Sequence, residues 1–585
     1  GRDTEAVSGE TPNLAARLQQ LAAPGEVIIG AATRRLAGHL FSLKDLGMHD
    51  LKGFAESIPA WKVIGETKAE SRFSALHGDA FSNLVGRESE LNLILNRWRL
   101  AKTGEGQVIL LSGEAGIGKS RITQAIRDEI KDDNYICIRY QCSPHNTNSP
   151  FSPAIQQMEF AAGFISEDGP EAKLNKLEGL LDLSSILDAI PLIAAMLSVP
   201  TGDRYPKLDL TPQEQKIKTL QALVAILKGL SLKRPVLFLF EDAHWIDPTT
   251  REQMSLAIDQ IATQSILLLM THRPEFETSW AAHSHCTSLA LNRLGREACA
   301  DVIYNLTEGL SLPAEVFEQI VTKTDGVPLF VEELTKTILE SDLLTRRDDR
   351  YTLEGPLPPL AIPSTLQDSL MARLDRLEKI KEVAQFGASI GREVPYALLE
   401  AISPLSGPEL EDALSLLIES EIMFRRGDGF EAVYVFKHAL IQDAAYESLL
   451  RSRRQQIHAS IAKVLQTRFA ERLENEPEVL AHHYTQAGLL QQAAPVWLKS
   501  GQRAVSRSAN LEAIAHLGYG LEVVAQLPAE LGVRDLELDM QISLGSALIA
   551  ALGYSSVDTE NAWLRARQLL NGLGEDPRQF AVLHG

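Results

Sequence analysis

The stretch that decides the fold is Val108–Ser120, which reads VILLSGEAGIGKS. Its apolar start predicts a buried strand, and the residues from 121 to 130 follow with a helix-like pattern. The loop between them matches G-x-x-x-x-G-K-[ST] through Gly113, Gly118, Lys119 and Ser120. Strand, loop and helix thus occur in the order that a phosphate-binding loop requires.

Backbone N–H groups of such a loop and the N-terminus of the following helix attract anionic oxygens. Lys119 is expected to reach the β- and γ-phosphates, and the Ser120 hydroxyl to bind Mg²⁺. We group Gly116 and Arg121 with these nucleotide-binding residues. The sequence therefore predicts a site for a nucleoside triphosphate.

Length, charge and composition limit the class of protein to which the chain can belong. The chain has 585 residues, enough for about three to five domains. Its formal net charge of −20 disfavours nucleic acid as a partner, because phosphate contacts dominate such affinity. Its apolar runs are short, so we expect no membrane span and a cytoplasmic location. The four cysteines form neither a close metal-ligand pair nor a dense disulfide framework.

A second apolar run, VLFLF, ends in Glu241-Asp242. Carboxylates at the carboxyl end of a buried parallel strand lie where ligands bind in open α/β sheets. One is expected to bind Mg²⁺ with Ser120, and the other to polarise the attacking water. Which carboxylate does which stays open at this point. A third run, 266–270, ends near Arg273, a candidate sensor of the γ-phosphate.

These pieces resemble the STAND subgroup of AAA+-related signalling ATPases over about residues 82–450. The matching stretches are VGRESEL, GEAGIGKS, FLFEDAHWID, THRPE, DGVPLFVEEL and FKHALIQDAAYESLL. The resemblance implies a nucleotide-binding domain, a small helical domain and a winged helix that ADP holds closed and ATP opens. It places Gly326 and Pro328 against adenine and His438 near the ADP β-phosphate.

The first 66 residues resemble the C-terminal part of class III adenylate and guanylate cyclases, through GETPNLAARLQQLAAPGEVIIG and DLGMHDLKGFAESIPAWKVIG. Thr11-Pro12 is expected to open a helix there, and FSLKDLG and PAWKVIG to form strands. By the resemblance, Asn13 orients the ribose, Arg17 stabilises the transition state and Lys52 contacts terminal phosphates. The family's two metal-binding aspartates belong to an earlier half that is missing here. We therefore expect no cyclase activity from this chain and a true N-terminus beyond Gly1.

From about residue 453 the pattern is helix after helix with Ala-rich faces. It resembles degenerate tetratricopeptide (TPR) repeats, which stack into a solenoid with a concave binding face. A protein partner or a small-molecule signal is the expected ligand of that face. A compact helical domain without repeats is the alternative. The last repeat lacks a polar cap, so we expect truncation at this end also.

The predicted fold class is multidomain α/β and α: a parallel-sheet P-loop NTPase domain, a helical domain plus winged helix, a C-terminal α-solenoid and a truncated α+β cyclase piece. The expected bounds are 1–66 (cyclase piece), 67–83 (linker), 84–290 (NTPase), 291–360 (helical), 361–452 (winged helix) and 453–585 (repeats).

The predicted function is an ATP-binding signal-transduction switch, a slow ATPase with ATP/ADP and Mg²⁺ as cofactors, that regulates a cyclase domain. Nucleotide-dependent self-association is a further expectation. Two alternatives are a LuxR-like transcription regulator that uses its winged helix on DNA, and a scaffold that binds nucleotide without turnover.

Overall fold

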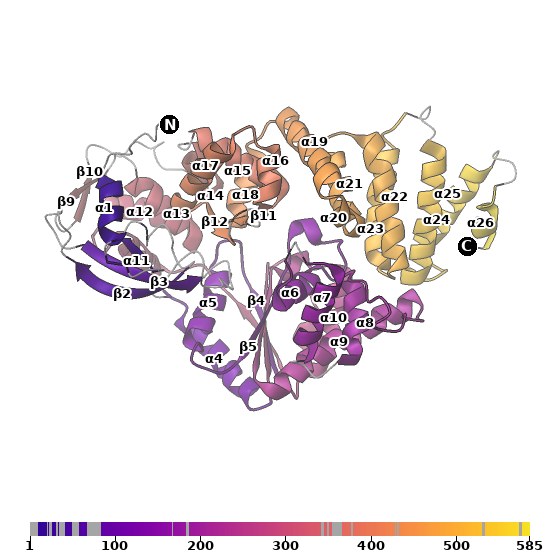
Figure 1. Cartoon of the computed structure of the whole chain (residues 1–585), viewed down its shortest axis with the longest axis horizontal. Coiled ribbons are helices and arrows are strands. Elements are labelled where there is room, and N and C mark those ends of the chain that lie inside the picture. Colours follow the sequence, from indigo (N-terminus) through magenta and orange to yellow (C-terminus); the bar gives the residue numbers. More distant parts are fainter. Residues whose placement is uncertain are drawn as a thin grey trace.

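Figure 1 shows the computed structural model of the chain. It describes residues 10–19, 21–22, 26–30, 33, 41–49, 58–66, 84–165, 168–182, 187–340, 344–347, 350–353, 365–375, 378–427, 429, 432–528, 533–571 and 576–584.

The N-terminal segment forms a small antiparallel sheet with one helix. Strands β1 (Val27–Gly30), β3 (Ile58–Glu66) and β2 (Phe41–His49) are hydrogen-bonded in that order, and α1 (Glu10–Gln19) packs on them through Leu18. The two predicted strands are confirmed. The predicted helix start, with Thr11 as N-cap and Pro12 as first helical residue, is wrong by two residues, because α1 begins at Glu10. Lys52 lies outside the described residues.

The next segment is built on a parallel sheet of five strands. Its order is β5 (Ile136–Gln141), β6 (Val236–Glu241), β7 (Ile266–His272), β4 (Gln107–Ser112) and β8 (Cys286–Ala290). Every residue of β6 and β7 is buried, because helices cover both faces of the sheet. This is why the two strands read as continuous apolar runs. The predicted parallel-sheet P-loop fold is confirmed.

The two faces of the sheet carry separate apolar cores. Ile109 and Leu111 of β4 face the core under α4 (Glu88–Lys102) and α5 (Lys119–Glu129). Val108 and Leu110 face the opposite core. The helices on that side are α6 (Ser152–Ala162), α7 (Pro170–Asp182), α8 (Ile190–Met196), α9 (Pro212–Lys233) and α10 (Pro248–Ile261).

Two further units follow the sheet. The first holds α11 (Arg296–Leu306), α12 (Ala314–Thr324), α13 (Pro328–Leu339) and a hairpin of β9 (Leu344–Arg347) and β10 (Arg350–Leu353). The hairpin was not predicted, because its four-residue strands are rich in charged residues. The second holds α14 (Leu366–Asp375), α15 (Glu378–Ile390), α16 (Tyr396–Ile402), α17 (Gly407–Glu419), α18 (Ala439–Glu447) and an antiparallel sheet of β11 (Glu393–Pro395), β13 (Val433–Phe436) and β12 (Met423–Arg426).

The rest of the described chain is helical, as predicted, and its helices pack in sequence in a row (Figure 1). They are α19 (Arg451–Arg468), α20 (Ala470–Asn475), α21 (Pro477–Gln486), α22 (Leu490–Ser506), α23 (Asn510–Val524), α24 (Val533–Leu552), α25 (Val557–Leu570) and α26 (Gln579–His584). Among the helices that the structure describes, none has the length and apolar character needed to cross a bilayer.

Glycines set how closely these helices approach. A Cβ atom added to Gly501 of α22 would lie 2.5 Å from Cδ2 of Leu517 in α23. One added to Gly520 of α23 would lie 2.8 Å from Cε of Met540 in α24. Each neighbouring side chain is fully buried, so it has no free space to move into.

We expect Gly501→Ala to lower the stability of the helical region by about 1–3 kcal/mol, because the added methyl group overfills a packed contact. The matched control is Gly518→Ala in α23, where an added Cβ meets nothing within 4 Å. There the better helix propensity of alanine should stabilise by roughly 0.5–1 kcal/mol. Calorimetric unfolding of both variants measures whether each substitution raises or lowers the stability. Equal changes of stability in the two variants would contradict the packing argument.

Candidate nucleotide-binding site

The phosphate loop has the backbone geometry that its motif predicts. Gly116 and Gly118 have φ of +77° and +104°, in the left-handed region that favours glycine. Gly118 is the N-cap of α5, so the loop opens directly onto the N-terminus of that helix. Gly113 must also stay small, since an added Cβ would lie 2.6 Å from Cγ2 of Ile117.

Lys119 is the first residue of α5, and its ammonium group turns back over the loop. It donates to the carbonyl oxygens of Gly113 (2.6 Å) and Glu114 (2.9 Å). Burial lowers the pKa of Lys119 to about 8; the charge of Asp242 opposes this shift and that of Arg273 adds to it. The next residue, Ser120, is exposed. The structure thus brings Lys119 together with the predicted catalytic residues Asp242 and Arg273.

The two carboxylates after β6 have different surroundings. Glu241 is 5% exposed and is held by Arg139 of β5, whose Nε donates to its Oε2 at 2.6 Å. Thr123 of α5 donates to the other oxygen, Oε1, at 3.4 Å. Glu241 is therefore fixed in an ion pair beside the helix that carries Ser120.

Asp242 lies one residue further on, with a positive φ of 58°. Its backbone N–H donates to Thr271 Oγ1 (3.1 Å) at the end of β7. Its carboxylate pairs with Arg392, whose Nη1 lies 3.3 Å from Oδ2. Arg392 belongs to the unit that contains α14–α18, so that unit contacts the acid pair directly.

Arg273 follows β7 and stacks on a ring of the β6 loop. Its guanidinium carbon lies 5.3 Å from the centroid of the Trp245 ring. His244 adjoins this pair, and burial lowers its pKa to about 4, with Asp242 opposing and Arg273 and Lys119 adding to the effect. Neither His244 ring nitrogen has a hydrogen-bond partner among the described residues. A neutral imidazole thus lies beside Arg273.

The turn with Gly326 and Pro328 packs on the phosphate loop. Pro328 is the first residue of α13, and the next residue, Leu329, donates its backbone N–H to the carbonyl of Gly116 (3.2 Å). A Cβ on Gly116 would lie 3.0 Å from Cβ of Leu329. The carbonyl of Gly326 accepts from the backbone N–H of Leu294 (2.8 Å). The residues beside the two predicted ones, Val327 and Leu329, thus contact the loop at Gly116.

A half-buried carboxylate links three segments. Burial alone would raise the pKa of Glu332 in α13, but the charges of Lys336 and Lys437 outweigh it and lower that pKa to about 2, with a smaller contribution from His438. Burial lowers the pKa of Arg121 in α5, and the negative charge of Glu332 opposes that shift. His438 is the N-cap of α18. Arg121 and His438 therefore face the same carboxylate from different segments.

The donor set fits Mg²⁺ bound together with nucleotide phosphates. Within the described ranges, no three His, Cys, Asp or Glu side chains gather closely enough to hold a metal ion alone. Mg²⁺ usually keeps waters and takes one or two carboxylates plus phosphate oxygens. Ser120, Glu241 and Asp242 would supply the protein oxygens, and the ion would neutralise phosphate charge.

Sequence reasoning missed Arg139, Arg392, His244 and Arg87. Arg87, 6% exposed, donates to the carbonyl of Ile117 in the loop (3.4 Å). His244 and Arg87 lie within the stretches FLFEDAHWID and VGRESEL, so their position in the motifs was a usable signal. The sequence held no such signal for Arg139 and Arg392. In the cyclase-like segment, Asn13 and Arg17 lie on α1 in one helical register, and Arg17 is half-buried.

Comparisons with known proteins match part of the chain to a nucleotide-binding family. Residues 83–269 match the family described as the AAA ATPase domain. An uncharacterized protein of Rhizobium meliloti is 30% identical over 562 residues, which cover 95% of this chain and 54% of that protein. The chain therefore spans about half the length of this relative. The hybrid signal transduction histidine kinase G of Dictyostelium discoideum is 25% identical over 191 residues, 32% of this chain and 6% of that protein.

Among solved structures, a STAND protein with a tetratricopeptide repeat sensor from Pyrococcus horikoshii gives a TM-score of 0.41 at 12% identity. The alignment covers 86% of this chain and 66% of that chain. Residues 83–269 thus resemble the AAA ATPase domain, a nucleotide-binding family, and they contain β4, β5, β6 and the first part of β7 from the five-stranded parallel sheet. The other domain bounds stay predictions.

We expect nucleotide affinity to fall as pH rises through the lowered pKa of Lys119. Phosphate oxygens favour the ammonium form, so binding above about pH 8 requires uptake of a proton. ADP titrations from about pH 7.5 to about 9.5 avoid the second phosphate pKa near 6. They should show up to about a tenfold loss per pH unit.

The matched control for this titration is Lys119→Arg, whose guanidinium group stays charged throughout the range. Its affinity should change little with pH, whatever its absolute value. A flat profile in the wild-type protein would contradict the assignment of Lys119 to the phosphates.

Proposed function

We propose that the chain is an ATP-binding signalling switch of the STAND type with slow hydrolysis. In this proposal the AAA ATPase domain binds ATP, and the helical domain and the predicted winged helix close over it in the ADP form. The observation that carries the proposal is the ion pair between Asp242 and Arg392. It joins a predicted catalytic carboxylate to the unit that the switch must move.

The site residues divide the chemistry as follows. Lys119 binds the β- and γ-phosphate oxygens, and Arg273 stabilises charge on the γ-phosphate. Glu241, held beside α5 by Arg139 and Thr123, belongs to the metal side with Ser120. Asp242 orients the attacking water and accepts its proton. This division is our proposal for the roles that the sequence left open.

Arg392 explains why turnover would be slow in the closed form. Its guanidinium group pairs with Asp242 Oδ2 and holds that carboxylate in one orientation. Opening of the α14–α18 unit would release Asp242 for the reaction. ATP can favour that opening only through a higher affinity for the open form.

The C-terminal helices contact the AAA ATPase domain and would carry the signal. Ser149 donates to Glu478 Oε1 of α21 (2.7 Å), and Arg507 donates to Ser198 Oγ (3.2 Å). The backbone N–H of Thr249, at the start of α10, donates to Glu512 Oε1 of α23 (2.9 Å). A protein or small molecule bound to the helical repeats would act on α10 through these contacts.

The output side rests on the resemblance of residues 1–66 to the cyclase C-terminal part, with Asn13, Arg17 and Lys52 in its active site. Regulation of a cyclase domain is the proposed role. Nucleotide-dependent self-association, a cytoplasmic location and the absence of a nucleic-acid partner also stay predictions.

The first experiment identifies the nucleotide that copurifies with the protein. Near-stoichiometric ADP, absent from a Lys119→Ala control, supports the ADP-held form.

The second experiment measures turnover. Asp242→Asn should lower ATP turnover about hundredfold, since a general base contributes at least about that factor to the rate. Its ADP affinity should stay within about threefold of the wild-type value.

The matched control for the second experiment is Glu277→Gln, an exposed carboxylate beyond β7. It should keep wild-type turnover. Undiminished turnover in Asp242→Asn would overturn the assignment of the base. A wild-type protein that binds ATP but never hydrolyses it would leave the scaffold alternative in place.

The contact of Glu512 with α10 gives a pH-dependent test of the signal path. Burial raises the pKa of Asp247, the N-cap of α10, to about 7, and the charge of Glu512 adds to this effect. Burial also raises the pKa of Glu512, and the positive charge of Lys216 opposes that rise. Raised carboxyl pKa values mean that the docked form binds protons more readily, so docking should weaken as pH rises through about 7.

Amide hydrogen exchange in the first turn of α10, corrected for intrinsic rates, measures this docking at about pH 6 and about pH 8. Glu512→Ala removes the acceptor of the Thr249 N–H and should speed exchange at both pH values. Glu512→Gln keeps an acceptor and removes the charge, so it should protect α10 and flatten the pH dependence. Identical behaviour of the two variants would contradict the proposed contact.

A further inference from the structure

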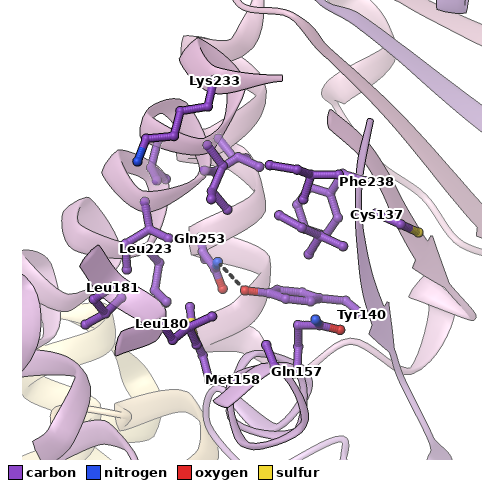
Figure 2. A pocket seen from close by; sticks show the side chains of 18 of the residues that line it. Cys137, Tyr140, Gln157, Met158, Leu180, Leu181, Leu223, Lys233, Phe238 and Gln253 are labelled. Carbon is purple, nitrogen blue, oxygen red and sulfur yellow. Dashed lines mark hydrogen bonds between the residues drawn. The ribbon is translucent and has the colours of Figure 1, made fainter. Parts of the chain in front are cut away.

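An apolar cavity lies on the side of the sheet away from α4 and α5 (Figure 2). Its volume is about 210 Å³, and it is bounded by β5, β6, α6, α7, α9 and α10. Most of its lining is aliphatic, from residues such as Leu181, Leu223 and Leu227. An apolar cavity of about 150 Å³ is enough to bind a benzene-sized molecule in an engineered protein. This one is larger.

Two polar side chains meet inside this apolar lining. Gln253 of α10 is 4% exposed, and its Nε2 donates to the phenolic oxygen of Tyr140 in β5 (3.1 Å). In that bond the Tyr140 oxygen is the acceptor, so its hydroxyl proton remains for another partner. Gln253 Oε1 is buried and has no hydrogen-bond partner among the described residues. Figure 2 shows both groups on the wall of the cavity.

The pair therefore offers one donor and one acceptor to whatever lies in the cavity. A hydroxyl group satisfies both, because it accepts from Tyr140 and donates to Gln253 Oε1. A carboxylate only accepts, and an ammonium group only donates. An apolar molecule without a polar group leaves both protein groups unsatisfied, which costs affinity.

The charges around the pair also favour a neutral ligand. Burial raises the pKa of Tyr140 to about 12, and the charge of Asp247 contributes to the rise. The surroundings that disfavour a phenolate there disfavour any anion at the same place. The two basic residues of the lining, Lys233 and Arg234, are exposed, and Arg234 donates to Asn134 (3.2 Å).

We propose that this cavity binds a neutral, mainly apolar molecule of about one aromatic ring in size that carries a hydroxyl group, with the hydroxyl between Tyr140 and Gln253. The class comprises phenols and medium-chain alcohols. The site is separate from the phosphate loop and from the concave face of the C-terminal helices.

The test is calorimetric titration of the full chain with p-cresol and with toluene, which lacks the hydroxyl. The wild-type protein should bind p-cresol about tenfold more tightly than toluene, since only p-cresol satisfies the buried pair. The assay needs neither ATP nor turnover, so its outcome is independent of the proposed switch.

Three variants locate the ligand. Gln253→Leu should remove the preference, leaving p-cresol and toluene with similar affinities. The matched control is Gln260→Leu on the same helix, outside the cavity, which should keep the tenfold preference. Ala161→Phe fills the cavity from an exposed position that does not threaten folding, and it should weaken both ligands.

Each contrary result overturns the proposal. No saturable binding of p-cresol would mean that water alone serves the polar pair. An unchanged preference in Gln253→Leu, or unchanged binding in Ala161→Phe, would place the ligand elsewhere. Tighter binding of p-toluate, lost in Lys233→Ala, would mean that the cavity selects anions at its basic rim.

Discussion

The rest of the structure depends on one close contact, in which the backbone of Leu329 donates a hydrogen bond to the carbonyl of Gly116. The contact requires a glycine in the loop, because a Cβ there would press on the Leu329 side chain. It joins the phosphate loop to the start of α13. A shift of the loop backbone at Gly116 would therefore alter a hydrogen bond to the first turn of α13.

Charged side chains add to the contact between the phosphate loop and α13. Glu332, one turn after the contact, is half-buried and interacts with Lys336 of α13 and with Lys437 of the α14–α18 unit. Arg392 of that same α14–α18 unit binds Asp242. Burying charged groups is favourable only when they are well paired. The segments after the sheet are thus held to the nucleotide site by ion pairs and hydrogen bonds that form only in a defined geometry. Contacts of this kind suit two discrete arrangements of the segments better than a gradual deformation.

The sequence was sufficient for features whose signal is local. The loop motif, the apolar runs of β4, β6 and β7, and the helical tail all follow from nearby residues, and the structure contains all of them. Arg139 and Arg392 could not be found in this way. They reach Glu241 and Asp242 across 102 and 150 positions of the chain, and no periodicity records such a pairing. The β9–β10 hairpin was missed because its short, charged strands look like loop.

The strand order has a consequence for synthesis on the ribosome. Strand β4 lies between β7 and β8, so both of its neighbours are made long after it. Chains grow at about 5–20 residues per second, so β4 and its loop wait on the order of ten seconds for their partners. The contact of Gly116 with Leu329 forms later still. The nascent chain thus carries an unpaired strand with an apolar centre, residues 108–111, during that interval, and this segment is exposed to aggregation until β7 and β8 are made.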